Sequence, residues 1–380
     1  MTAQPLDPTR GGWVASPAWD LSFMFSAVWG SALCLLLGYQ VGPGPAVATL
    51  FAWNWLIAIL HSFSTTYMVV ASPLMRGARQ RNRLKFTWAP LAIAAGCVAL
   101  GWSIGVSGGF PESFPLGPGQ ALWIFYLALF WVGHFWHFGN QDFGVLSIYR
   151  GKSGQSSPLE RRADKAYAVA MMFAIQPIVY LSVITRSPWS EAVRSVVPLS
   201  EPMIAGAANV AVAAAGILTL AIVAFELRKP ASSLPKLLYY GVMFSHPLVL
   251  YLIDWQLAAF YTIAYFWSHW FIAIGLVGRI NTNYYRGRGS SLPRALFFHL
   301  ATFGWFALAG ALFHLFFGNY SVFSGRNYKE LLSAVGPEWQ GIIGLLLGVF
   351  LAEQLVHYYC DRCLFRFRDP DVRRAVAPLI

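Results

Sequence analysis

The stretch MIAGAANVAVAAAGILTLAIVAF, residues 203–225, contains no charged side chain. A transmembrane α-helix needs about 20 consecutive, mostly apolar residues to cross the hydrocarbon core of a bilayer. This stretch meets the requirement, so it predicts a membrane-spanning helix.

The composition of the whole chain supports the same class. Of its 380 residues, 57% are hydrophobic and only 11% are charged, whereas about one quarter of the residues of a soluble domain are charged. About ten segments are long and apolar enough to cross a bilayer as helices. The expected spans are Trp19–Gln40, Pro45–Ala71, Phe86–Val106, Gln120–Tyr149, Ala166–Thr185, Met203–Phe225, Pro235–Ile253, Trp255–Val277, Pro293–Phe317 and Gly341–Tyr359.

The positive charges predict the orientation, because basic loops stay on the cytoplasmic side. Cytoplasmic termini place the Arg and Lys clusters within 76–85, 150–165, 228–236, 279–294 and 362–374 on that side. The chain therefore reads as an all-α polytopic protein with both termini cytoplasmic, and we expect it in the bacterial inner membrane. A net charge of +11 suits an anionic membrane surface and calls for no nucleic-acid partner.

The expected domain organisation is simple. Residues 1–18 read as a polar tail without the features of a cleaved signal peptide, and residues 19–361 as one transmembrane domain. Residues 362–380 read as a basic cytoplasmic tail.

Histidines recur at one depth of the predicted spans. With a rise of about 1.5 Å per residue, His61, His137, His246 and His269 lie roughly 15 Å from the cytoplasmic ends of their helices. His299 and His357 are about a turn shallower, and His134 is one turn deeper than His137 on the same helix face. A lone membrane histidine often only bonds a neighbouring helix. Several at one depth favour a metal site, because imidazole in hydrocarbon is costly.

Acidic residues accompany these histidines. Glu353 and His357 are four residues apart and share a helix face, which Asp361 continues, and Asp142 follows His134 by two turns. The candidate metal ligands are His61, His134, His137, His246, His269, Glu353 and His357. Candidates for a supporting role, or for weaker ligands, are His299, Asp142, Gln141, Thr65 and Asp361. No catalytic residue apart from these is indicated.

Histidine with one or two carboxylates is the ligand set of non-haem iron, and equally of zinc. Oxygen and lipids both partition into the membrane, so an iron site there can oxidise a substrate that never enters water. The leading hypothesis is an oxygenase, desaturase or oxidative-cleavage enzyme that holds one or two irons and acts on a lipophilic substrate. Its further partners would be membrane lipids and either a cytoplasmic electron donor or a larger membrane complex.

Three stretches carry a family resemblance: HSFSTTY at 61–67, GHFWHFGNQDFG at 133–144 and WSHWF at 267–271. With single histidines on several spans, the chain resembles the histidine-rich integral-membrane iron enzymes, among them the Brp-related carotene-cleaving dioxygenases. The resemblance implies a polytopic helical fold, iron, and a carotenoid or retinoid substrate. The HxxxH and HxxHH boxes of desaturases do not occur in the chain.

Other classes of protein fit parts of the pattern. The spacing of His357 and Asp361 resembles the HxxxD of membrane zinc hydrolases related to alkaline ceramidases, in which zinc activates water against a lipid amide or ester. Two histidines on facing helices could instead bind haem or another pigment. A structural subunit of a membrane complex and a proton-coupled transporter complete the alternatives.

Overall fold

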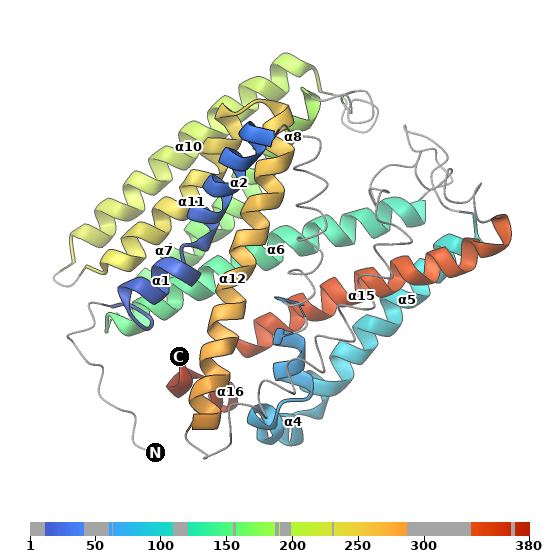
Figure 1. The fold of residues 1–380 in the computed structure, drawn as a ribbon, viewed down its shortest axis with the longest axis horizontal. Helices are drawn as coiled ribbons and strands as arrows, with labels where there is room; N and C mark the ends of the chain where they lie inside the picture. The colour runs from blue at the N-terminus through green and yellow to red at the C-terminus, as the bar shows by residue number, and fades with distance from the viewer. Residues whose placement is uncertain are drawn as a thin grey trace.

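The computed structural model describes residues 12–41, 61–62, 64–108, 121–154, 157–186, 190, 199–229, 232–286, 336–365 and 369–380 (Figure 1). Within these ranges the secondary structure is helical throughout, without a strand. The predicted span Pro293–Phe317, with His299, and most of Pro45–Ala71 lie outside the described residues.

The described residues form the following helices, given in chain order. The α-helices are α1 (Pro17–Phe23), α2 (Ser26–Val41), α4 (Arg76–Arg81), α5 (Ala89–Val106), α6 (Ala121–Lys152), α7 (Pro158–Val169), α8 (Gln176–Thr185), α10 (Glu201–Leu227), α11 (Leu234–Leu252), α12 (Trp255–Arg286), α15 (Gln340–Leu364) and α16 (Pro370–Val376). Short π-helical segments, Leu84–Trp88 and Ala170–Ile175, lead into α5 and join α7 to α8. Short 3₁₀ turns occur at Pro73–Met75, Pro337–Trp339 and Ala377–Leu379.

Several of these helices suit a membrane. Among the described residues, five helices are long and apolar enough to cross a bilayer, and a bent pair formed by Pro17–Phe23 and Ser26–Leu36 would be a sixth. The five are Leu84–Val106, Ala121–Lys152, Pro158–Thr185, Glu201–Leu227 and Gln340–Leu364. They indicate an integral membrane protein, because only helices or closed barrels satisfy their backbone groups in lipid. The number of about ten spans and the cytoplasmic termini stay predictions.

Several predicted spans differ from the observed helices, and α11 and α12, which cover two of them, are not among the five. The span expected from Ala166 begins at Pro158, because Ser157 and Glu160 form a capping box that starts the helix two turns earlier. The span expected over Trp19–Gln40 is bent by 54° between α1 and α2.

The C-terminal residues form helices where the sequence predicts only a basic tail. Within the predicted tail 362–380, α15 continues to Leu364 and α16 packs near α4. Arg81 donates to Asp371 at 2.9 Å and Lys85 to Asp369 at 2.5 Å. The hydrogen bond from Arg81 lowers the pKa of the Asp371 carboxyl below its ordinary value. These ion pairs hold α16 against the start of the α5 span.

The helices form two groups that α6 connects (Figure 1). On one side α10 packs against α8 and α11, and on the other α5 lies along α15. Helix α6 contacts members of both groups, including α7 and α15, and α12 packs against α2. Helix α6 is therefore the element through which the two groups meet.

The contact between α5 and α15 is made by glycines. A Cβ atom added to Gly344 would lie 2.8 Å from the Cα of Gly105 and against the backbone oxygen of Gly101. A Cβ atom on Gly348 would lie 2.7 Å from the Cα of Val98. The two backbones approach so closely because glycines occupy the contact positions of α15 and, at Gly101 and Gly105, those of α5.

Two hydrophobic cores follow from this arrangement. The smaller core lies between α5, the first half of α6 and the first half of α15, and includes Trp123, Tyr126 and Leu347. The larger core takes the second half of α6, including Phe138 and Leu146, and packs it against the remaining helices. The candidate ligands on α6 and α15 thus lie near the boundary between the two cores.

Candidate metal centre

Helices α6 and α15 bring two of the predicted ligand stretches together. His137 lies on α6, while His357 and Asp361 lie on consecutive turns of α15 and point from the same face. His61 comes from the short described segment 61–62, directly before the helical residues 64–70.

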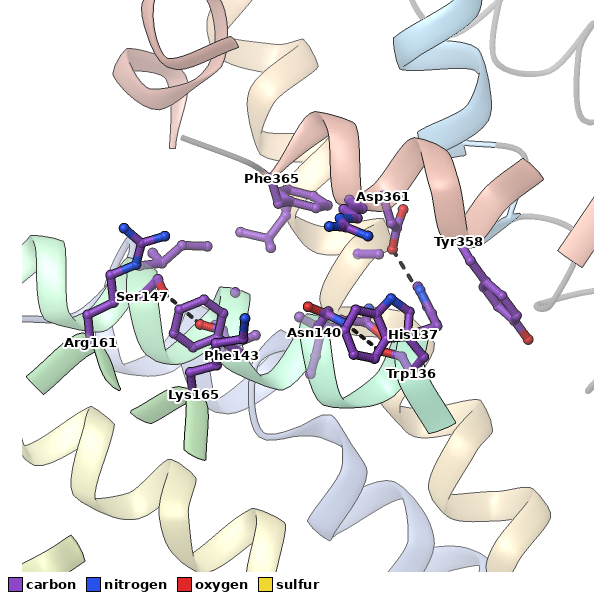
Figure 2. A pocket seen from close by; sticks show the side chains of 18 residues that line it. Trp136, His137, Asn140, Phe143, Ser147, Arg161, Lys165, Tyr358, Asp361 and Phe365 are labelled. Atoms are coloured by element: carbon purple, nitrogen blue, oxygen red, sulfur yellow. Dashed lines mark hydrogen bonds and ion pairs between the residues drawn. The ribbon is translucent and has the colours of Figure 1, made fainter. Parts of the chain in front are cut away.

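These four residues form one compact group. Each of His61, His137, His357 and Asp361 offers a ligand atom, and the four atoms lie within 4.8 Å of one another. The ring centroids of His61 and His357 are 4.4 Å apart, and those of His137 and His357 are 4.8 Å apart. Nε2 of His137 lies 3.7 Å from Asp361 Oδ2 (Figure 2). Nδ1 of His357 lies 3.6 Å from Oδ1 of the same carboxylate. We call this set the His3Asp group.

The His3Asp group is buried and incompletely bonded. Its side chains are between 1% and 5% exposed. Both ring nitrogens of His61, Nε2 of His137 and of His357, and both carboxylate oxygens of Asp361 have no hydrogen-bond partner. Buried polar atoms normally find partners, because leaving one unpaired costs about 1–3 kcal/mol. A cation at the centre of the group would satisfy these atoms together, so the group could hold a metal ion.

Neighbouring side chains fix the imidazoles. Thr65 Oγ1 lies 2.8 Å from Nδ1 of His357, which leaves Nε2 of that ring as the available ligand atom. The ring of His137 stacks on Tyr358 at 4.4 Å, and that of His61 stacks on Trp270 at 5.8 Å. Such contacts set the orientation and tautomer of ligand histidines.

His134 lies on the same helix as His137 but does not join the group. Its Nδ1 lies 3.1 Å from the hydroxyl of Tyr358, which donates to Gln354 Oε1 at 3.2 Å. Gln354 in turn donates to Glu353. His134 and Glu353 are therefore the two ends of a polar chain that passes beside the His3Asp group.

Glu353 is one turn before His357 on α15, and its Oε1 is buried without a hydrogen-bond partner. It is not part of the His3Asp group. On α15, His357 and Asp361 are the residues that face His61 and His137, so Asp361 supplies the carboxylate of the group.

The histidines of α11 and α12 also lie apart from the group. Nε2 of His246 bonds the hydroxyl of Tyr180 at 2.9 Å, and its ring stacks on Tyr265. His269 lies 3.6 Å from Asp142, whose Oδ1 accepts a hydrogen bond from Tyr239 at 2.7 Å. The pair His269 and Asp142 forms a second buried polar cluster, separated from His137 by the ring of Phe138.

A cavity of about 220 Å³ opens beside the His3Asp group (Figure 2). Its lining includes His137, Asp361 and Tyr358 together with Gln141, whose amide atoms are buried without hydrogen-bond partners. A small molecule in this cavity would touch the candidate ligands directly.

Sequence reasoning did not single out Tyr358 or Tyr239. Tyr358 touches His134, stacks on His137 and lines the cavity. The available signal was its position directly after His357 in a predicted span, where a hydroxyl needs a partner.

No family model, curated protein or solved structure matches this chain. The resemblance to carotene-cleaving dioxygenases stays a prediction from short stretches, and the chemistry of the His3Asp group carries the functional conclusion.

Proposed function

We propose that this chain is a membrane-embedded, metal-dependent oxidoreductase, with iron as its metal and a lipophilic molecule as its substrate. The observation that supports this is the His3Asp group, whose unpaired buried atoms converge beside a cavity.

The donor set favours iron over zinc. Zinc with four protein ligands is a closed tetrahedral site, which is the structural form of a zinc site. Iron accepts more ligands, and non-haem iron oxygenases keep open positions beside their histidine and carboxylate ligands. With three imidazoles and one carboxylate at hand, iron would retain room for oxygen or substrate.

Each residue has a defined part in this proposal. His61, His137 and His357 would hold the metal, and Asp361 would offset part of its charge. Thr65 would keep the ring of His357 in place, and the stacked rings of Tyr358 and Trp270 would limit the access of water. Bound iron would supply one-electron and oxygen chemistry.

A zinc hydrolase of lipid amides or esters is the second candidate. Catalytic zinc takes three protein ligands and a water molecule, so the three histidines would suffice if Asp361 acted as a base. The oxygens of Asp361 lie 3.6 and 3.7 Å from the nearest ring nitrogens, which leaves this role open to it.

Haem suits the geometry less well. Haem ligation by two histidines needs a flat slot between the rings for the macrocycle. Here three rings and a carboxylate converge on one point. The ring centroid of His357 lies only 4.4 Å from that of His61 and 4.8 Å from that of His137.

The proposal includes the topology, with about ten spans, cytoplasmic termini and a place in the bacterial inner membrane. The distribution of positive charge supports it. Reporter fusions made after Val106 and after Leu227 test it, because these helix ends fall on opposite sides of the proposed arrangement. Equal reporter activity at both sites would contradict it.

Metal analysis of the detergent-purified protein tests the metal. We expect about one or two irons per chain and no Soret band, and a His137→Ala, Asp361→Ala double variant should lose the iron. A His246→Ala variant is the control, because His246 bonds Tyr180 outside the group. Zinc in place of iron would favour the hydrolase, and a protein without metal would refute the proposal.

The reaction itself needs a second assay. Oxygen consumption with carotenoids, sterols or fatty acyl chains as substrates, measured with and without an added electron donor, should depend on the bound iron. A protein that binds iron in the His3Asp group yet consumes no oxygen with any of them would contradict the oxygenase.

A further inference from the structure

The cavity beside the His3Asp group has two chemically different ends (Figure 2). His137, Asp361 and Tyr358 lie at one end, together with Arg362, whose guanidinium lies over the ring of Trp136. Arg161 and Lys165 lie at the other end. Helix α6 forms the floor between them, from His137 to Ser147. Ten residues of helix correspond to about 15 Å, so the two ends are well separated.

The wall between the ends carries both apolar and polar side chains, the polar ones being Asn140, Gln141 and Ser147. Phe143, Val145, Ile148, Leu276 and Phe365 contribute to it. These side chains come from α6, from α12 and from the residue that follows α15. A hydrocarbon chain would bury its surface against the apolar part of this wall.

The far end carries positive charge that its described neighbours do not neutralise. Arg161 and Lys165 are four residues apart on α7 and share one face. The acids nearest to them in sequence are engaged elsewhere, since Glu160 pairs with Lys229 at 3.1 Å and Asp164 pairs with Arg150. Within the described cavity lining, the only carboxylate is that of Asp361, at the opposite end.

We propose that this cavity binds an amphiphile with an anionic head group at Arg161 and Lys165, and with its hydrocarbon body along α6 toward the His3Asp group. This inference rests on the proposed function and narrows its substrate class. Arg and Lys recognise carboxylates and phosphates through charge-assisted hydrogen bonds. The head group therefore belongs to a fatty-acid-like carboxylate or to a lipid phosphate.

The two ends also suit the membrane. Arg161 and Lys165 lie in the first turns of α7, a region expected at the cytoplasmic surface. An amphiphile bound as proposed keeps its charge near the interface and places a carbon of its chain at the candidate metal site. The distance from the head group would then select the reacting carbon.

Equilibrium binding of radiolabelled ligands in an uncharged detergent tests the proposal. The three probes are hexadecanoate, hexadecyl phosphate and hexadecanol, which share one chain and differ in the head group. We expect the anionic probes to bind about tenfold or more tightly than hexadecanol. The stronger of the two anions identifies the carboxylate or the phosphate as the preferred head group.

An Arg161→Gln, Lys165→Gln double variant removes the proposed head-group contacts. It should bind the anionic probes about tenfold more weakly, with hexadecanol binding unchanged. The matched control is Arg162→Gln with Arg228→Gln, which removes the same charge from two exposed residues outside the cavity lining. Equal binding of all three probes by the unsubstituted protein, or undiminished anion binding by the first variant, would overturn the proposal.

Metal content separates this proposal from the proposed function. The Arg161→Gln, Lys165→Gln variant should keep its metal, because neither residue belongs to the His3Asp group. The His137→Ala, Asp361→Ala variant should lose metal and still prefer the anionic probes. A protein without metal that retains this preference would refute the proposed function and leave the head-group site standing.

Discussion

At the scale of single residues, Asp361 decides which chemistry the site can perform. As a ligand it completes a four-donor set, and as a free carboxylate it could accept a proton from water. Its distances of 3.6 and 3.7 Å to two imidazoles place it close enough for either role.

An Asp361→Asn substitution distinguishes the two roles. We expect the metal content to fall severalfold, because a neutral amide is a weaker ligand than a carboxylate. Metal analysis after dialysis measures this, with Asp142→Asn as the control, since Asp142 bonds Tyr239 outside the group. Full retention of metal with loss of activity would instead assign Asp361 the role of a base.

Thr65 is expected to act through His357, because its hydroxyl lies 2.8 Å from Nδ1 of that ring. A Thr65→Val substitution removes this contact at nearly constant volume. The metal affinity should fall about 10–100-fold, as it does when the hydrogen-bond partners of ligand histidines are removed. A competition titration with a chelator measures the affinity.

Thr282→Val is the matched control for this substitution. Thr282 is exposed and bonds only the carbonyl of Gly278 in its own helix. Equal affinities of the two variants would show that Thr65 does not orient the ring.

A substitution of Glu353 tests how far the metal-binding site extends along α15. It bonds Gln354 and lies outside the His3Asp group, so a Glu353→Gln substitution should leave the metal content unchanged. The metal content is measured beside that of Asp361→Asn. Loss of metal in the Glu353→Gln variant would mean that Glu353 is also a metal ligand.

At the scale of elements, the geometry of the site depends on how closely α15 approaches its neighbours. Helix α15 carries His357 and Asp361 at its second half, while its first half lies against α5 through glycines. The position of α15 is therefore fixed some distance away from the site it serves.

A Gly344→Ala substitution should separate α15 from α5. The added methyl group would meet the backbone of Gly101 and Gly105, and overpacking of this kind costs about 1–3 kcal/mol. We expect a lower thermal unfolding midpoint of the detergent-solubilised protein and a lower metal content.

Gly96→Ala is the control on the facing helix. An added Cβ at Gly96 meets nothing within 4 Å, so this variant should be as stable as the unsubstituted protein or slightly more stable. If both variants unfolded at the same temperature, the close contact would not contribute to stability.

At the scale of the whole molecule, a buried charge network joins four helices. Lys236 of α11 lies 3.0 Å from Asp164 of α7 and 3.0 Å from Glu226 of α10. Arg150 of α6 also pairs with Asp164, and Lys229 pairs with Glu226 at 2.6 Å. The network ties the helix that carries His137 to the group of α10 and α11.

A Lys236→Met substitution would leave two buried carboxylates short of a partner. Removal of one member of a buried ion pair costs about 3–5 kcal/mol, so we expect a marked fall in the thermal unfolding midpoint. A second substitution, Glu226→Gln, should restore part of the loss. The exposed Arg228→Met variant is the control and should change stability by no more than about 0.5 kcal/mol. An unchanged midpoint for Lys236→Met would contradict a stabilising network.

The sequence by itself determined the helical membrane class, because hydropathy over about 20 residues reports directly on membrane insertion. It also determined the proximity of His357 and Asp361, since residues four apart share one face of a helix. The sequence does not distinguish the two acids by spacing, since Glu353 and Asp361 both lie four residues from His357. The cost of a carboxylate in hydrocarbon favours Glu353 as the ligand, whereas the structure brings Asp361 into the group.

The tertiary structure decided which of the predicted ligands face each other. The regular rise of a helix fixes the position of a side chain along the helix axis. The rotation of each helix about that axis depends instead on packing with its neighbours. That rotation turns His137 toward His357, and leaves His246 with Tyr180 and His269 with Asp142. The cations at the far end of the cavity are likewise brought to it by the packing of α7 against α6, which no local pattern in the sequence records.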